Sequence, residues 1–248
     1  MISRTLTWKI YAYISDVWVD ISSDVLIGGG AINARWGIMG NAETDRMAET
    51  GILTFSMNNV TGKYSPDLSG AMAGWKKGTP IKLVFTFDGQ DYTRFRGRID
   101  NLVIDAGTRK KRRVLVSVTD WLDYASEFPL DQLEIMLNRR ADQAIETIIN
   151  KMPIQPASAT FDDGDNTFPV VFNTLTENTR AYSEITKLVL SEMGYFYLQK
   201  DASAGELLVF EAGSQRSSLL PVSSIPKPSE NVDYILKEDG DAILKENN

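Results

Sequence analysis

Two stretches in which apolar residues occupy nearly every second position constrain the fold of this chain most. They cover residues 51–58 and 80–88. The alternating apolar residues are Leu53, Phe55 and Met57 in the first stretch and Ile81, Leu83, Phe85 and Phe87 in the second. A repeat of two is the period of a strand with one buried face, so both stretches are predicted to be half-buried strands.

Turn and bulge signals lie beside these strands. Asp88-Gly89 is a hairpin dipeptide, and Gly97 suits a bulge or a close approach of two backbones inside the next strand. Residues 114–119 place valine at every second position. The first half of the chain is therefore predicted to be almost entirely β.

Helical periodicity appears only in the second half. Residues 141–152 carry apolar side chains at spacings of three and four, which form one stripe along a helix. A second helix is predicted to begin near Asn178 or Thr179, which are good N-cap residues, and to end with Gly194 in the C′ position. A β-hairpin is expected to follow, so the second half is predicted to be α+β.

The order of these pieces resembles the N-terminal part of bacteriophage tail-tip proteins, the baseplate-hub family of long-tailed phages and prophages. The pattern over residues 49–100 carries most of the resemblance. Trp18-Val19-Asp20-Ile21 is similar to the family's opening strand, Val114 to Leu122 to its closing strand, and Ala181 to Tyr197 to its helix-glycine-strand unit. The similarity covers residues 10–212.

The resemblance implies a fold and domain boundaries. It implies a mainly β protein with a β-barrel of the tail-hub type over residues 1–122, then a small α+β domain with two helices over 123–216. Residues 217–248 form a Pro/Ser linker and a tail in which Ile235-Leu236-Lys237-Glu238-Asp239-Gly240 is echoed by Ile243-Leu244-Lys245-Glu246-Asn247-Asn248. This echo is either a docking strand for another tail component or a disordered tail with accidental similarity.

The resemblance also implies a function without chemistry. The chain would be a structural component of the tail tip, assembled in the bacterial host cytoplasm, and not an enzyme. It would form a ring, with a trimer favoured and a hexamer possible, that joins the tail tube to the tip spike or fibres. DNA would pass through the ring without specific binding. Its partners would be a tube or distal ring protein above and a spike or fibre protein below.

One departure from the family concerns a second barrel, which hub proteins usually have and which this sequence does not show. Three explanations are open. The chain is a short variant, or six copies close the ring, or the partner barrel lies on another chain.

Composition excludes several kinds of site. The chain has no cysteine and no histidine, so disulfides, zinc-thiolate sites, iron-sulfur clusters and catalytic triads built on histidine are excluded. It shows no signal peptide and no apolar run of the ~20 residues that a membrane span needs. We therefore expect a soluble protein with no membrane partner.

Charge is divided unevenly between the halves. Residues 1–124 contain 16 Lys and Arg and 13 Asp and Glu, a net of +3, whereas residues 125–248 contain 10 and 20, a net of −10. An acidic balance argues against general nucleic-acid binding, because phosphate neutralisation supplies most of that affinity. It would let DNA pass a ring without sticking, or it serves solubility alone.

Two basic clusters supply the candidate interface residues. Arg94, Arg96 and Arg98 alternate along one predicted strand, so we expect them on one face, either as a charged interface or lumen or as a face wetted by solvent. The second cluster follows the predicted turn at residues 106–108 and consists of Arg109, Lys110, Lys111, Arg112 and Arg113. It either contacts DNA or an acidic neighbouring subunit, or it is a solvated hairpin tip that protects a sheet edge.

No catalytic, cofactor or metal site is predicted. Residues 162–166 superficially resemble a calcium loop but lack the EF-hand spacing, so a turn is favoured over weak calcium binding. Gly28-Gly29-Gly30 lacks the Lys-Ser/Thr that follows in a phosphate loop.

Two functions of other classes stay open. A carbohydrate- or receptor-binding module of the tail would stack sugars on Trp18, Trp36, Trp75 and Trp121, although burial in a core is the commoner fate of such residues. A cell-wall hydrolase could work with carboxylates alone, but no paired carboxylates lie in a recognisable frame. Glycan binding would favour the first, and lysis of peptidoglycan the second.

Overall fold

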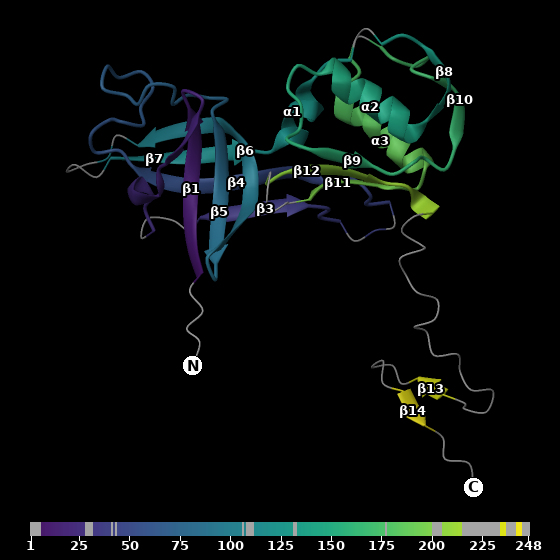
Figure 1. The fold of residues 1–248 in the computed structure, drawn as a ribbon, viewed down its shortest axis with the longest axis horizontal. Coiled ribbons are helices and arrows are strands. Elements are labelled where there is room, and N and C mark those ends of the chain that lie inside the picture. Colours follow the sequence, from purple (N-terminus) through teal and green to yellow (C-terminus); the bar gives the residue numbers. More distant parts are fainter. Residues whose placement is uncertain are drawn as a thin grey trace. The chain divides into compact units, whose positions relative to one another are not determined.

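The computed structural model describes residues 6–27, 32–40, 42, 44–105, 107, 112–130, 133–176, 178–199, 205–214, 234–236 and 242–244. Contacts divide the chain into two compact units, Met1–Gly213 and Ser214–Asn248. The first unit contains all the described helices and most of the described strands (Figure 1).

The first unit begins with a seven-stranded antiparallel sheet in the order β2-β1-β5-β6-β7-β4-β3. Its strands are β1 (Leu6–Ile14), β2 (Val17–Asp20), β3 (Asn33–Gly37), β4 (Glu49–Asn58), β5 (Pro80–Phe87), β6 (Gln90–Asp105) and β7 (Arg113–Thr119), and the short 3-10 helix η1 (Ser22–Asp24) follows β2. The predicted alternation is confirmed at Leu53, Phe55, Met57, Ile81 and Leu83, which are buried, but not at the end of β5, where Phe87 is 36% exposed. The buried residues join one hydrophobic core on the inner face of the sheet.

The sheet is curled around this core, but it is not a closed barrel (Figure 1). The edge strands β2 and β3 do not pair with each other within the described residues. The chain after β2 narrows the opening, because Val25 forms an isolated bridge with Met57 and the Leu26 N–H donates to the Ser56 carbonyl at 2.8 Å. The closed barrel that the resemblance implies is therefore not confirmed, because the described strands leave the edges β2 and β3 unpaired with each other.

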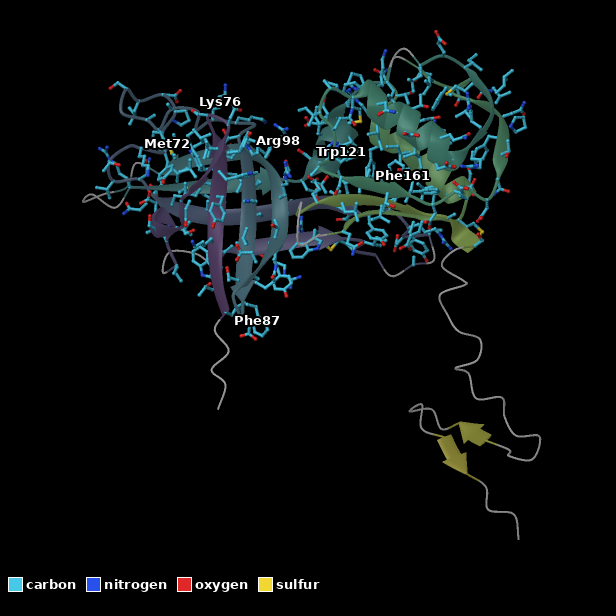
Figure 2. All side chains as sticks on the ribbon, viewed as in Figure 1. Met72, Lys76, Phe87, Arg98, Trp121 and Phe161 are labelled. Carbon is cyan, nitrogen blue, oxygen red and sulfur yellow. The ribbon has the colours of Figure 1, made fainter. Side chains whose placement is uncertain are left out.

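The two ends of the curled sheet differ. One end is covered by residues 59–79, whose Tyr64 and Trp75 rings are buried and pack edge to face with centroids 5.0 Å apart. Met72 marks this end in Figure 2, and Phe87, the last residue of β5, marks the other. Among the described residues, no segment comparable to 59–79 lies over the end near Phe87.

An α+β part follows the sheet. Its helices are α1 (Trp121–Glu127), α2 (Ala141–Lys151) and α3 (Ala181–Ser191), and its strands are β8 (Met136–Arg140), β9 (Ala159–Phe161), β10 (Thr167–Val171), β11 (Tyr195–Gln199) and β12 (Leu207–Glu211). The strands form a three-stranded sheet, β11-β12-β9, and a two-stranded ribbon of β8 and β10. The predicted apolar stripe at 141–152 is buried in a second hydrophobic core. α1 is an additional helix beyond the two that the sequence predicts.

Hydrogen bonds join the segment just before β4 to the α+β part. The Ala48 N–H donates to the Phe196 carbonyl at 2.8 Å, and the Phe196 N–H donates to the Arg46 carbonyl at 2.9 Å. The Tyr182 hydroxyl on α3 donates to the Ala48 carbonyl at 2.7 Å. Burial raises the pKa of Tyr182 to about 12, so this hydroxyl keeps its proton near neutral pH. The domain boundaries at residues 122 and 216 stay predictions.

The second unit contains a pair of short strands, β13 (Tyr234–Leu236) and β14 (Ala242–Leu244). They are antiparallel, and Ile235 lies opposite Ile243. The apolar starts of the two echoed segments therefore pair with each other. A docking role for this tail stays a prediction, and the predicted linker over 217–233 lies outside the described residues.

Candidate functional site

The outer face of the sheet carries cations and aromatic rings on four neighbouring strands. Lys82 on β5 lies opposite Tyr11 on β1 and Arg96 on β6. The Lys82 Nζ lies 4.6 Å from the ring centre of Trp18 on β2 and 5.1 Å from that of Tyr11. The Arg96 Cζ lies 5.8 Å from the Trp18 ring centre. We call these four residues the cation–aromatic cluster.

The electrostatics of the cluster favour an anionic partner. Burial lowers the pKa of Lys82, and the neighbouring charge of Arg96 lowers it further, whereas Asp91 acts in the opposite direction. Two positive charges against one indole ring form a field that attracts a carboxylate. Trp, Tyr and Arg are also the residues most enriched in the energetic centres of protein interfaces. The cluster is therefore suited to an acidic surface of another protein.

The cluster lies beside an edge of the sheet. β2 is the last strand of the sheet and pairs only with β1 within the described residues. Val17, at the start of β2, is 61% exposed. The outer backbone groups of an edge strand are available to an additional strand, so this edge and the cluster form one continuous surface for a partner.

A β-bulge separates Arg94 from the other two arginines of its predicted row. β5 and β6 shift register between Leu83 and Val84, which leaves Arg94 as the extra residue of β6. The prediction that all three arginines share one face is therefore wrong. Arg96 and Arg98 line the same cavity, whereas Arg94 lines a different groove at the uncovered end of the sheet.

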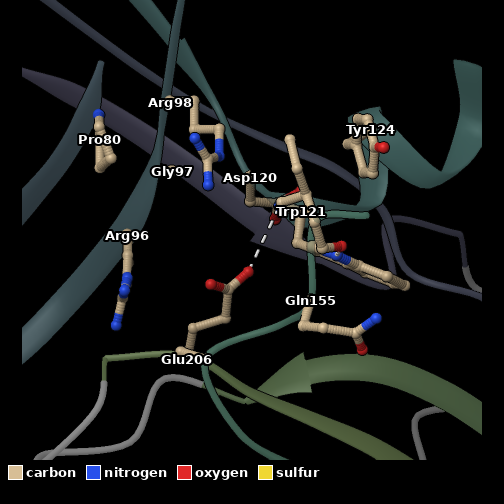
Figure 3. Close-up of a pocket in the computed structure, with 11 residues that line it drawn as sticks. Pro80, Arg96, Gly97, Arg98, Asp120, Trp121, Tyr124, Gln155 and Glu206 are labelled. Carbon is tan, nitrogen blue, oxygen red and sulfur yellow. Dashed lines mark hydrogen bonds between the residues drawn. The ribbon is translucent and has the colours of Figure 1, made fainter. Parts of the chain in front are cut away.

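Arg96 and Arg98 face a cavity of about 60 Å³ between the sheet and α1 (Figure 3). Across the cavity, the buried Glu206 accepts the Trp121 N–H at 3.3 Å, the contact drawn as a dashed line in Figure 3. The Trp121 indole N–H donates to the Ile154 carbonyl at 2.9 Å. A cavity of this size holds only a few water molecules, so we interpret it as part of the contact between the sheet and the α+β part.

The predicted basic run is described only at its last two residues, which lie beside the β6–β7 hairpin. Arg109, Lys110 and Lys111 lie outside the described residues. The Arg112 carbonyl accepts the Asn59 N–H at 2.9 Å. The Arg113 Nε–H donates to the Asp105 carboxylate at 3.0 Å. The Gly107 N–H and then Arg113 lower the pKa of Asp105, which is therefore held as the anion that partners Arg113.

The described residues of the two predicted basic clusters do not lie together. Arg98 lies opposite Thr119 at the end of β7, and Arg113 is the first residue of that strand. Six residues of extended chain separate these positions by about 20 Å. The cluster that the structure assembles instead joins Arg96 to residues that the sequence does not connect with it, because Lys82 and Trp18 are its neighbours only across strands.

Half of the tryptophans proposed for sugar stacking are core residues. Trp75 is 2% exposed and Trp121 is 6% exposed. Trp36 is 36% exposed and lines the same groove as Arg94. Of this set, only Trp18 and Trp36 have ring surface that a sugar could reach.

The acidic loop at residues 162–166 is held by protein groups. Asp163 lies 2.7 Å from Arg140, and the N–H groups of Asp165 and Asn166 donate to the Glu192 carboxylate. In the described part of the chain, no group of three or more His, Cys, Asp or Glu side chains is arranged to hold a metal ion. Among the described helices, none is long and apolar enough to cross a membrane.

No protein-family model matches this chain, and no curated protein sequence matches it. Solved structures similar to it in fold include a tail protein from Neisseria meningitidis MC58, with 11% identity and a TM-score of 0.49 over 81% of this chain and 50% of that protein. A 43 kDa tail protein of prophage MuSo2 from Shewanella oneidensis has 12% identity and a TM-score of 0.48 over 83% of this chain and 54% of that protein.

A third similar structure is a component of the type VI secretion system of E. coli that is described as structurally similar to tail proteins of bacteriophage T4. It has 11% identity and a TM-score of 0.45 over 84% of this chain and 46% of that protein. The chain spans about half the length of each of these proteins. Its structural neighbours are thus two tail proteins and one secretion component likened to tail proteins.

Proposed function

We propose that this chain is a structural protein of a phage or prophage tail. It acts at the tail tip as part of a ring that joins the tail tube to the tip spike or fibres and lets DNA pass. It works through contacts alone and catalyses no reaction. The ring consists of copies of this chain, three or six in number, and forms in the bacterial host cytoplasm.

The observation that carries this proposal is the cation–aromatic cluster. Like charges side by side on a sheet repel each other, and Lys82 lies directly opposite Arg96 across β5 and β6. They are well placed to receive carboxylates from a neighbouring protein, where complementary charge sets register and specificity. We therefore assign the cluster to contact with an acidic component of the tail.

The order of the elements supports the same proposal. The curled sheet precedes α3, Gly194 and β11, which is the helix-glycine-strand order that the sequence resemblance implies. The net charge of −10 over residues 125–248 supports DNA passage, because an acidic wall does not hold phosphate.

Mass photometry with negative-stain electron microscopy of the purified full-length chain tests the ring. We expect closed rings of three or six copies. A chain that stays monomeric at every concentration and is absent from tails of its source would contradict the proposal. If such a monomer bound sugars on a glycan array, the carbohydrate-binding function would replace the structural one.

A further inference from the structure

An apolar groove of about 590 Å³ lies at the uncovered end of the curled sheet. Its apolar lining comes mainly from β1, β3 and β5 and includes Trp8, Trp36, Leu83 and Phe85. Ile27, at its rim, is 74% exposed. Concave apolar surface of this extent is typical of a site that a partner covers.

A second apolar surface lies on the ribbon of β8 and β10. Leu137 and Val170 lie opposite each other across the ribbon, and they are 63% and 42% exposed. Ile135, two residues before Leu137, is 61% exposed. Within the described residues, the ribbon has two strands and no third. We call Ile135, Leu137 and Val170 the ribbon patch.

We propose that the ribbon patch of one copy fills the groove of the next copy, an inference that rests on the proposed ring. The groove and the ribbon patch lie on different elements of the same unit (Figure 1). A contact between two unlike surfaces is heterologous, and it repeats from copy to copy until a ring closes. The three exposed apolar side chains are then buried from water against the tryptophan side chains that line the neighbouring groove.

Charge favours the same pairing. Arg94 is the one charged residue that lines the groove in the described part of the chain, and its Cζ lies 5.5 Å from the Tyr92 ring centre. Glu134 directly precedes Ile135 and is exposed. Glu134 is therefore next to the apolar patch in the chain, where its carboxylate could pair with the Arg94 guanidinium of a neighbouring copy. β8 also carries Arg139 and Arg140 beyond the patch, and Arg140 pairs with Asp142 and Asp163.

Two variants of the full-length chain separate the halves of this contact. Leu137→Asp places a charge in the ribbon patch, and Arg94→Glu reverses the charge of the groove. Both residues are exposed, so we expect both variants to fold with an unchanged unfolding temperature. Each variant alone should associate about tenfold more weakly than the wild type, the usual effect of losing an interface centre. Leu190→Asp on α3, where Leu190 is 43% exposed, is the matched control and should leave rings intact.

The decisive measurement is an equimolar mixture of the two variants, analysed by mass photometry. Each Arg94→Glu copy still has an intact ribbon, and each Leu137→Asp copy still has an intact groove. One good contact therefore forms per pair, and the mixture should give dimers but no rings. Rings that form in both variants as in the wild type, or a mixture that gives no dimers, would overturn the contact.

The fate of this contact is distinguishable from that of the proposed function. If both variants form rings as the wild type does, the groove–ribbon contact is refuted and the structural role is left intact. A wild-type chain found at the tail tip that never associates with itself would refute the contact in the same way. Binding of a glycan in the groove, abolished by Trp36→Ala, would assign the groove to a sugar instead.

Discussion

Among single residues, Lys82 is the clearest case of a charge partly buried against aromatic rings, those of Trp18 and Tyr11. Its pKa is lowered first by this burial and then by the charge of Arg96. A carboxylate from a partner would offset both causes, so we expect partner binding to raise the pKa of Lys82 again. The pKa of Lys82 is therefore expected to show whether an acidic partner covers the cation–aromatic cluster.

The pH dependence of stability tests this account of Lys82. Its pKa in the folded chain lies below the ordinary value of 10.5. Between the two values the unfolded chain binds more protons, so stability rises with pH through that interval. The free energy of unfolding of the wild type, measured relative to Lys82→Met by denaturant titration, should thus increase as the pH rises toward 10.5. A constant or falling difference would contradict the account.

Gly205 lies at a position where the structure does not accommodate a side chain. Its φ is +77°, and a Cβ would lie 2.2 Å from the Thr93 methyl group on β6. Gly89 has a similar φ of +79° with nothing within 4 Å, so it isolates the effect of φ. We expect Gly205→Ala to lower the free energy of unfolding by about 1–3 kcal/mol more than Gly89→Ala.

Thr93→Ser supplies the control for Gly205, because it removes the methyl group nearest to the new Cβ and leaves the Thr93 Cβ, at 2.8 Å, as the remaining close atom. In that background, the extra destabilisation by Gly205→Ala over Gly89→Ala should become smaller, as measured by chemical unfolding. If Thr93→Ser leaves the loss of unfolding free energy by Gly205→Ala unchanged, the close contact between Gly205 and Thr93 is not its cause.

At the scale of elements, strong periodicity was sufficient to predict α2, β4 and β5, because each buries one continuous face. α1 has seven residues, too few to show a helical period. The signal that could have found it is Asp120, whose carboxylate accepts the Leu122 N–H at 3.1 Å as an N-cap. The β8–β10 ribbon was missed because most of its residues face solvent and it contains a proline.

The ends of α3 show why boundaries are harder to predict than elements. The helix begins after Arg180, which makes no side-chain cap, rather than at Asn178 or Thr179. Met193, and not Gly194, holds the positive φ of +51° after the helix. Gly194 is required for another reason, because a Cβ there would lie 2.5 Å from the Glu211 carbonyl oxygen.

The candidate site could be predicted only in part for a related reason. The sequence shows that Arg94, Arg96 and Arg98 occupy every second position, but it does not show which strand pairs with them. The register with β5 decides where the bulge falls, and that register depends on contacts between strands. Lys82 joins Arg96 through the same register.

Substitution of Asp120 tests the capping of α1. Asp120→Ala removes the oxygen that accepts the Leu122 N–H, and we expect it to lower the free energy of unfolding by about 1–2 kcal/mol. Asp120→Asn keeps an acceptor at the same position and should lose less than half as much. Equal losses for the two variants in urea titrations would mean that the carboxylate acts through its charge and not as a cap.

At the scale of the whole molecule, two hydrophobic cores form one unit and leave three surfaces for partners. These are the cation–aromatic cluster, the groove and the ribbon patch. In our account the groove and the ribbon patch join copies within a ring, and the cation–aromatic cluster contacts an acidic neighbour in the tail. The separation of these surfaces lets each contact be broken independently.

Incorporation into tails tests the cation–aromatic cluster. The double variant Lys82→Gln/Arg96→Gln, competing with wild-type chain during assembly, should enter tails about tenfold less often, as measured by quantitative mass spectrometry. Lys77→Gln/Lys151→Gln removes the same charge from two exposed positions outside the cluster, and it should enter tails like the wild type. Equal incorporation of both double variants would remove the cluster from the assembly interface.

Electron microscopy of intact tails labelled with an antibody against this chain tests whether the chain lies in a ring at the tail tip. We expect label at the tip end of the tail, in a fixed number of three or six copies per particle. Tails that lack the chain, or that carry it along the whole tube, would contradict a role in the tip ring.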